Sequence, residues 1–81
     1  MRMEAPLDPA AVYRLANRRK LMVLTKSLTP KRDDFCRIRS VETVHPGLWI
    51  TATFPNGSIQ CFRPEKIREA TLDEEQIAGG F

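Results

Sequence analysis

The 81-residue chain has few of the residues on which metal, phosphate and catalytic sites depend: two cysteines, one histidine and four glycines. A structural zinc site needs four cysteine or histidine ligands at short spacings, and the chain has no Cys-x-x-Cys pair. None of the glycines has the spacing of a phosphate-binding loop. No serine–histidine–aspartate or cysteine–histidine arrangement is visible either. The sequence therefore predicts a non-catalytic protein without a metal or a cofactor.

Long apolar runs are also absent. No apolar stretch approaches the length that spans a membrane. The start of the chain lacks the basic residues, apolar run and small-residue site of a signal peptide. We therefore predict a cytoplasmic protein. Cys36 and Cys61 lie in apolar, strand-like runs, which favours two reduced thiols in the core over a disulfide between them.

Charge is present but uneven along the chain. Residues 1–40 hold ten lysines and arginines against four acidic residues, whereas residues 41–81 hold three against six. The formal net charge is +3. A basic first half and an acidic second half indicate an anionic partner for the first half, or self-association of the chain.

The stretch from Leu48 to Phe62 is the most informative part of the sequence, because it predicts a β-hairpin. Asn56-Gly57 is typical of a two-residue type I′ turn. This turn pairs Phe54 with Ile59. Side chains then alternate between two faces. The predicted core face holds Ile50, Ala52, Phe54, Ile59 and Cys61. The opposite face holds Trp49, Thr51, Thr53, Gln60 and Phe62.

The first part of the chain predicts an arm, a helix and a strand. Residues 1–7 have no pattern and are expected to form a flexible arm. Residues 8–20 are expected to form a helix, with Asp8 as its N-cap and Pro9 in its first turn. Residues 21–24 are apolar on both sides, which suits a short buried strand.

The middle of the chain predicts a loop, a long strand and a turn. Residues 27–34 form a polar loop broken by proline. Residues 35–44 form a second strand whose apolar positions change parity near Ser40, as a bulge or sharp bend would produce. His45, in the turn before Gly47, is interpreted as a surface residue.

The last part predicts a closing strand and a tail. Pro64 ends the fourth strand, and a 3₁₀ turn leads to a short strand within residues 67–70. Residues 71–81 form the C-terminal turn and tail. Thr71-Leu72-Asp73-Glu74 matches a capping box and starts one helical turn, while residues 79–81 are expected to fray.

These elements predict a single, mainly β domain over residues 1–81. Five short strands with tight turns resemble the small SH3-like barrel over residues 21–70, a shape shared by Tudor-type and KOW-type modules. The alternative is an N-terminal helix packed on a three-stranded meander. An SH3-like fold hosts many functions, so the fold alone does not select one.

Our first functional hypothesis is a module that binds a protein or a ribonucleoprotein through an aromatic and basic face. Exposed aromatic residues often anchor interfaces. The residues assigned to this face are Trp49, Thr51, Gln60, Phe62, Arg37 and Arg39. In the competing interpretation the two aromatic rings are covered by the terminal segments and form a second small core.

The second hypothesis is direct binding of RNA or DNA by the basic half of the chain. Arginines and lysines contact phosphates, and aromatic rings stack on bases. The residues assigned to this role are Arg18, Arg19, Lys31 and Arg32, together with Arg37 and Arg39 of the second strand.

A third hypothesis comes from the segment Gly57-Ser58-Ile59-Gln60-Cys61-Phe62. It resembles the Val-Gln-Ile-Tyr strand of the plasmid-borne type B dihydrofolate reductases, which are short SH3-like chains with an active site in the pore of a tetramer. Ile59 and Gln60 match that strand, whereas Cys61 and Phe62 replace its isoleucine and tyrosine. The resemblance implies a small oligomeric reductase.

Overall fold

The computed structural model describes residues 8–44 and 47–81, so the predicted arm and the turn residue His45 lie outside the described residues. The elements follow one another in this order: α1 (Pro9–Asn17), β1 (Leu21–Leu24), η1 (Arg32–Asp34), β2 (Phe35–Val44), β3 (Gly47–Thr53), β4 (Ile59–Phe62), η2 (Pro64–Lys66), β5 (Ile67–Glu69) and α2 (Leu72–Ile77).

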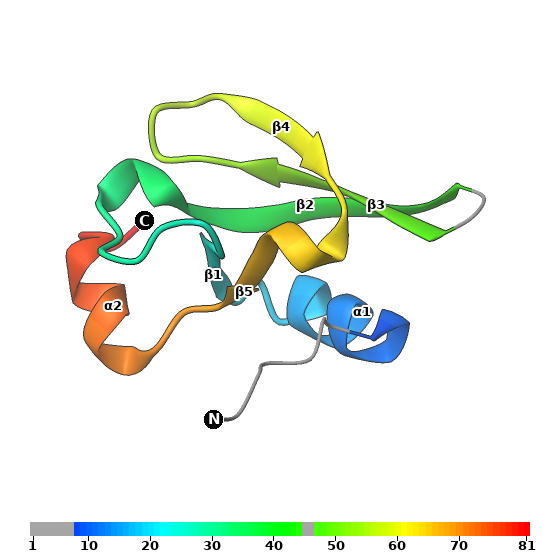
Figure 1. Ribbon diagram of the computed structural model, residues 1–81, viewed down its shortest axis with the longest axis horizontal. Helices are drawn as coiled ribbons and strands as arrows, with labels where there is room; N and C mark the ends of the chain where they lie inside the picture. The colour runs from blue at the N-terminus through cyan, green and yellow to red at the C-terminus, as the bar shows by residue number, and fades with distance from the viewer. Residues whose placement is uncertain (1–7, 45–46) are drawn as a thin grey trace.

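The five strands form one antiparallel sheet in the order β4-β3-β2-β1-β5 (Figure 1). The prediction of a mainly β domain with five strands and a short N-terminal helix is therefore confirmed. Closure into a barrel is not seen, because no ladder joins β4 to β5 within 8–44 and 47–81. Pro64 follows β4 closely and has no amide proton for a ladder, and η2 begins there. The sheet is thus open, with β4 and β5 as its edges.

Helix α1 begins as the sequence predicts. The amide of Ala11 donates to the Asp8 carboxylate at 2.7 Å, and Pro9 occupies the first helical position. The helix ends at Asn17, three residues earlier than predicted, because Arg19 adopts a left-handed conformation with φ 52°. The amides of Arg19 and Lys20 donate to the carbonyls of Ala16 and Leu15, which is the Schellman pattern of a helix end.

Two apolar clusters lie on opposite sides of the sheet at β1. The larger joins α1 to the inner face of the sheet and contains Val12, Leu15, Met22, Cys36, Ile38, Leu48, Ile50, Ala52, Phe54 and Ile67. The smaller contains Leu21, Val23, Phe35 and Ala78, with Ala70 and Phe81 packed against it. Met22 faces the first cluster, while its two neighbours face the second. This confirms the prediction that residues 21–24 form a strand buried on both sides.

The predicted irregularity in β2 is also confirmed. Ile38 pairs with Ala52, and Ser40 pairs with Thr51, so that Arg39 is the extra residue of a bulge. The bulge restores Val41 to the inner face, where it packs against the larger cluster.

The β3–β4 hairpin is paired one residue out of step with the prediction. Thr53 pairs with Ile59, and the loop is closed by hydrogen bonds from Gly57 to the Phe54 carbonyl and from Phe54 to the Ser58 carbonyl, both 2.9 Å. Gly57 has φ 88°, whereas Asn56 has no positive φ. These features match a three-residue loop with a type I turn and a glycine bulge. Pro55 is the physical reason, because a two-residue loop would need its missing amide proton.

The shifted register exchanges the faces of β4. Ile59 and Cys61 were predicted in the core, and both are exposed. Phe62 pairs with Ile50 and packs against the larger cluster, with its ring 6.3 Å from that of Phe54 in a T-shaped arrangement. The predicted common face of Trp49 and Phe62 is therefore wrong. Of the two free cysteines, only Cys36 is buried.

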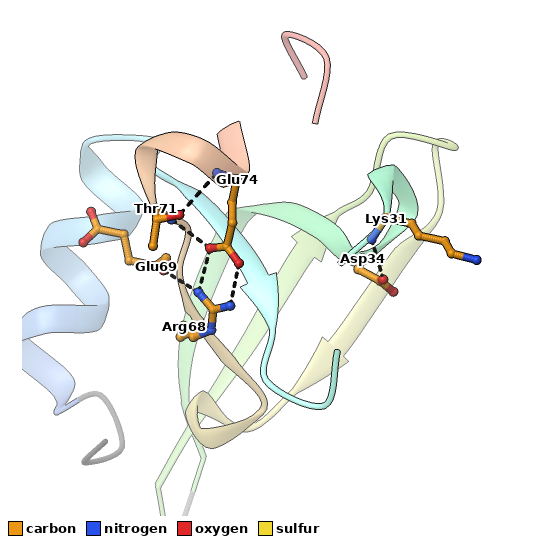
Figure 2. A network of polar contacts seen from close by, with 6 residues as sticks. All are labelled: Lys31, Asp34, Arg68, Glu69, Thr71 and Glu74. Carbon is orange, nitrogen blue, oxygen red and sulfur yellow. Dashed lines mark hydrogen bonds and ion pairs between the residues drawn. The ribbon is translucent and has the colours of Figure 1, made fainter. Parts of the chain in front are cut away.

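Helix α2 confirms the predicted capping box. The Glu74 amide donates to the Thr71 hydroxyl, and the Thr71 amide donates to the Glu74 carboxylate. Figure 2 shows that the same carboxylate receives two bonds from Arg68, at 2.8 and 2.7 Å. One side chain thus ties the start of α2 to the edge strand β5.

Candidate partner-binding site

The strand β4 forms one of the two free edges of the sheet. In an antiparallel pair, residues bonded across the ladder alternate with residues whose backbone groups point away. The bond from the Phe54 amide to the Ser58 carbonyl sets this alternation. Gln60 and Phe62 are then bonded to β3, while the N–H and C=O groups of Ile59 and Cys61 point outward. No strand lies on that side within the part of the chain that the structure describes.

A groove of about 480 Å³ runs beside this edge. Its lining residues are Leu24, Thr25, Lys26, Gln60, Cys61, Phe62, Glu65 and Lys66. Thr25 fixes the wall opposite β4, because its amide donates to the Lys66 carbonyl at 2.9 Å and its hydroxyl donates to the Glu65 carbonyl at 3.1 Å. The groove is therefore bounded by the β4 edge on one side and by a hydrogen-bonded wall on the other.

The groove carries a small excess of positive charge. Lys26, Lys66 and Glu65 are all exposed. The ion pair between Arg68 and Glu74 is the one that the described residues contain, so neither lysine of the groove is neutralised by a carboxylate. An anionic group entering the groove would meet two unpaired ammonium groups and one carboxylate.

The outer face of β3 and β4 is partly open. Ile59 is 50% exposed. The Thr51 hydroxyl lies 3.3 Å from the Cys61 sulfur. Trp49 is half-buried, because the Arg63 guanidinium lies 4.2 Å from its ring centroid. The same guanidinium donates to the Leu48 carbonyl at 3.2 Å, so the tryptophan ring is capped.

The structure separates the residues predicted for the partner-binding face. Trp49 and Thr51 share the outer face with Ile59 and Cys61. The register places Gln60 and Phe62 on the opposite face, where they line the groove.

The two arginines of β2 also differ in their surroundings. Arg39 is exposed at the bulge. Arg37 is half-buried and holds the end of the chain: it donates to the carbonyls of Phe81 and Arg19, and its guanidinium lies 5.7 Å from the Phe81 ring centroid. Arg32 acts in the same way, since its Nε donates to the Ala78 carbonyl at 3.3 Å. The expectation that residues 79–81 fray is therefore corrected.

The other residues predicted to bind nucleic acid remain at the surface. Arg18 and Arg19 follow α1, and Lys31 precedes η1. All three side chains are exposed. Arg32 and Arg37, by contrast, are already engaged with backbone carbonyls.

Two ionisable groups have strongly shifted pKa values. Hydrogen bonds from Arg68, followed by the bond from the Thr71 amide, lower the pKa of Glu74 to about 2. Burial raises the pKa of the Cys36 thiol to about 12, which keeps it protonated and unreactive. Both groups lie away from the groove and serve the fold.

Comparisons with known proteins give no relative: no family model, curated protein or solved structure matches the chain. Within residues 8–44 and 47–81, no three histidine, cysteine or acidic side chains are grouped so as to hold a metal ion. No helix of the same residues has the length and apolar character needed to cross a membrane.

Sequence reasoning missed Lys26, Lys66, Ile59 and Cys61 as members of the candidate site. Lys66 follows β4 closely in sequence, but Lys26 is distant from it. The bonds of Thr25 to the carbonyls of Lys66 and Glu65 place Lys26 on the same wall of the groove. The outward position of Ile59 and Cys61 was predictable from Pro55, which disfavours a two-residue loop at Asn56-Gly57.

Proposed function

We propose that the chain is a non-catalytic, SH3-like binding module that engages a protein partner through β4. The strand order and the 3₁₀ turn η2 before the last strand support the SH3-like assignment. The observation that carries the functional proposal is the groove beside an unpaired strand edge. Its volume lies within the range of about 300–1,000 Å³ that is typical of ligand sites. The exposed side chain of Ile59 adds apolar contact area on the outer side.

Photo-crosslinking in the cell of origin tests this proposal. A photoreactive amino acid replaces Ile59 in one version of the chain and Leu72 of α2 in a control. Leu72 is the stricter control because it is 82% exposed, more than Ile59. We expect a discrete protein adduct from position 59 and none from position 72. Equal labelling at both positions, or none at position 59, contradicts the proposal.

Direct binding of nucleic acid is the second candidate, supported by the exposed Arg18, Arg19 and Lys31. The engagement of Arg32 and Arg37 with carbonyls weighs against it. Titration with single-stranded and duplex oligonucleotides at two salt concentrations decides the matter. Binding through several phosphates weakens steeply as salt rises, whereas a flat or absent response removes this candidate.

The reductase hypothesis requires an oligomer. A sizing column therefore tests it, and elution as a monomer removes it. Binding through β4 as proposed here needs no second copy.

A further inference from the structure

We infer that the groove accepts an extended, acidic segment of a partner protein as an added strand along β4. This inference rests on the proposed binding role and specifies its mode and the chemistry of the partner. Three features carry it: the outward backbone groups of β4, the unpaired lysines of the opposite wall and the size of the groove.

The backbone of β4 supplies the pairing groups. Ile59 and Cys61 each direct one N–H and one C=O away from β3, and these four groups have no strand partner in the described part of the chain. Exposed strand edges pair readily with extended segments of other proteins. A peptide offers the alternating donors and acceptors that such an edge requires. A DNA backbone offers acceptors at its phosphates and no donors, so it would leave both carbonyls unsatisfied.

The side chains of the groove favour an acidic segment. Lys26 and Lys66 lie on the wall opposite β4 without ion pairs, and Glu65 offsets one of them. The four residues of β4, Ile-Gln-Cys-Phe, contain no charge. A second copy of the chain paired through the same edge would bring no carboxylate of β4 to these lysines. Carboxylates of a partner strand would neutralise them.

The wall opposite β4 is held in place without the partner. Thr25 is bonded to the carbonyls of Lys66 and Glu65. At about 480 Å³ the groove falls in the lower half of the range for ligand sites. A binding site that is already formed loses little conformational entropy when it is filled.

The test uses two end-blocked eight-residue peptides and nitrogen-15 NMR of the whole chain. One peptide alternates valine and glutamate, and the other alternates valine and lysine. We expect the glutamate peptide to shift the amide resonances of Ile59 and Cys61 and to bind at least about tenfold more tightly than the lysine peptide. Equal binding of the two peptides would overturn the inference.

Variants of the protein separate the backbone contribution from the charge contribution. Cys61→Ala keeps the outward N–H, whereas Cys61→Pro removes it and leaves the bonds of Gln60 and Phe62 to β3 in place. We expect Cys61→Pro to bind about fivefold or more weakly than Cys61→Ala, which corresponds to one hydrogen bond. Lys66→Gln weakens binding about two- to fivefold, whereas Lys20→Gln, an exposed lysine outside the groove, leaves it unchanged.

A glutamate peptide methylated at every amide nitrogen keeps the test decisive if Cys61→Pro does not fold. This peptide cannot donate to the edge, and we expect no binding. Undiminished binding of the methylated peptide overturns strand addition. So does tighter binding of octathymidylate at the same resonances, which assigns the groove to nucleic acid. Shifts of the Ile59 and Cys61 amides with protein concentration alone would assign the edge to a second copy and overturn it too.

The peptide test and the crosslinking test fail separately. A protein adduct at position 59, together with no preference for the glutamate peptide, leaves the binding role standing and removes the acidic strand. Strand addition by the glutamate peptide without any cellular adduct shows that the edge is competent, and removes the proposed cellular role.

Discussion

The strands β1 and β4 are both four residues long and largely apolar, Leu-Met-Val-Leu and Ile-Gln-Cys-Phe, yet their surroundings differ completely. β1 lies between β2 and β5, and its first three side chains are buried. β4 pairs with β3 alone, and its first three side chains are exposed. Place in the strand order, more than local hydrophobicity, decides which strand stabilises the fold and which is available to a partner.

Arginine side chains also hold the C-terminal segment against β1, whereas the described residues provide no such contact over β4. Arg32 and Arg37 donate to carbonyls near the end of the chain, and Arg68 is paired with Glu74 of α2. These contacts cover the outer face of β1 with the C-terminal segment (Figure 1). On the outer face of β3 and β4, the Arg63 side chain lies over Trp49.

Substitutions of apolar residues in β1 and β4 should give the largest difference in the free energy of unfolding. Met22 is fully buried, and Met22→Ala should lower the free energy of unfolding by about 2–5 kcal/mol. Ile59→Ala removes a half-exposed side chain and should cost less than about 1 kcal/mol. Urea denaturation of both variants measures the difference. Equal losses would mean that β4 is as buried as β1.

The arginine contacts of the β1 side should give the next largest effect. Arg37→Ala removes the charged hydrogen bonds to Phe81 and should cost about 1.5–3 kcal/mol. Arg39→Ala, two residues along the same strand, is the matched control because its side chain is exposed. Urea denaturation should show almost no effect for the control. A comparable loss in both variants would show that Arg37 does not hold the C-terminal segment.

The pairing of Arg68 with Glu74 should make stability depend on pH. Because the folded-state pKa of Glu74 is lowered to about 2, its contribution is complete above its ordinary pKa of 4.5 and is lost as pH falls towards 2. At pH 7, Glu74→Gln should be about 1–2 kcal/mol less stable than the parent chain. Urea titrations near pH 2 should show little difference in the free energy of unfolding between Glu74→Gln and the parent chain. A gap that is unchanged between pH 7 and pH 2 would contradict this assignment.

The end of α1 should give the smallest effect, with the opposite sign. Arg19 occupies a left-handed position that glycine adopts without cost. Arg19→Gly should therefore raise the free energy of unfolding by about 1 kcal/mol, while Arg19→Ala should not. The carbonyl that accepts from Arg37 is kept in both variants. Thermal unfolding of the two variants measures the difference in stability. A loss of stability in Arg19→Gly would contradict the proposal that the left-handed conformation of Arg19 is strained.

Much of the fold was predictable because its determinants are local. Asp8-Pro9 started the first helix, the capping box at Thr71 started the second, and the parity change near Ser40 marked the bulge. Asn56-Gly57 alone predicts the wrong hairpin register, because Pro55 lacks the amide proton that a two-residue loop needs. A shift of one residue exchanged Phe62 with Ile59 and Cys61 between the two faces.

The candidate site was predictable only in part because it depends on distant contacts. Trp49 and Thr51 do lie together on the outer face. The roles of Arg32 and Arg37 depend on carbonyls more than forty residues away, at Ala78 and Phe81. The groove forms where Thr25 meets Lys66, and no local pattern indicates that contact.

Amide hydrogen exchange of β4 in the chain without a partner tests the free edge most directly. The structure predicts an alternation: the amides of Gln60 and Phe62, bonded to β3, should exchange at least about tenfold more slowly than those of Ile59 and Cys61. Equal protection of all four amides would mean that another strand already occupies the edge, and would contradict the account.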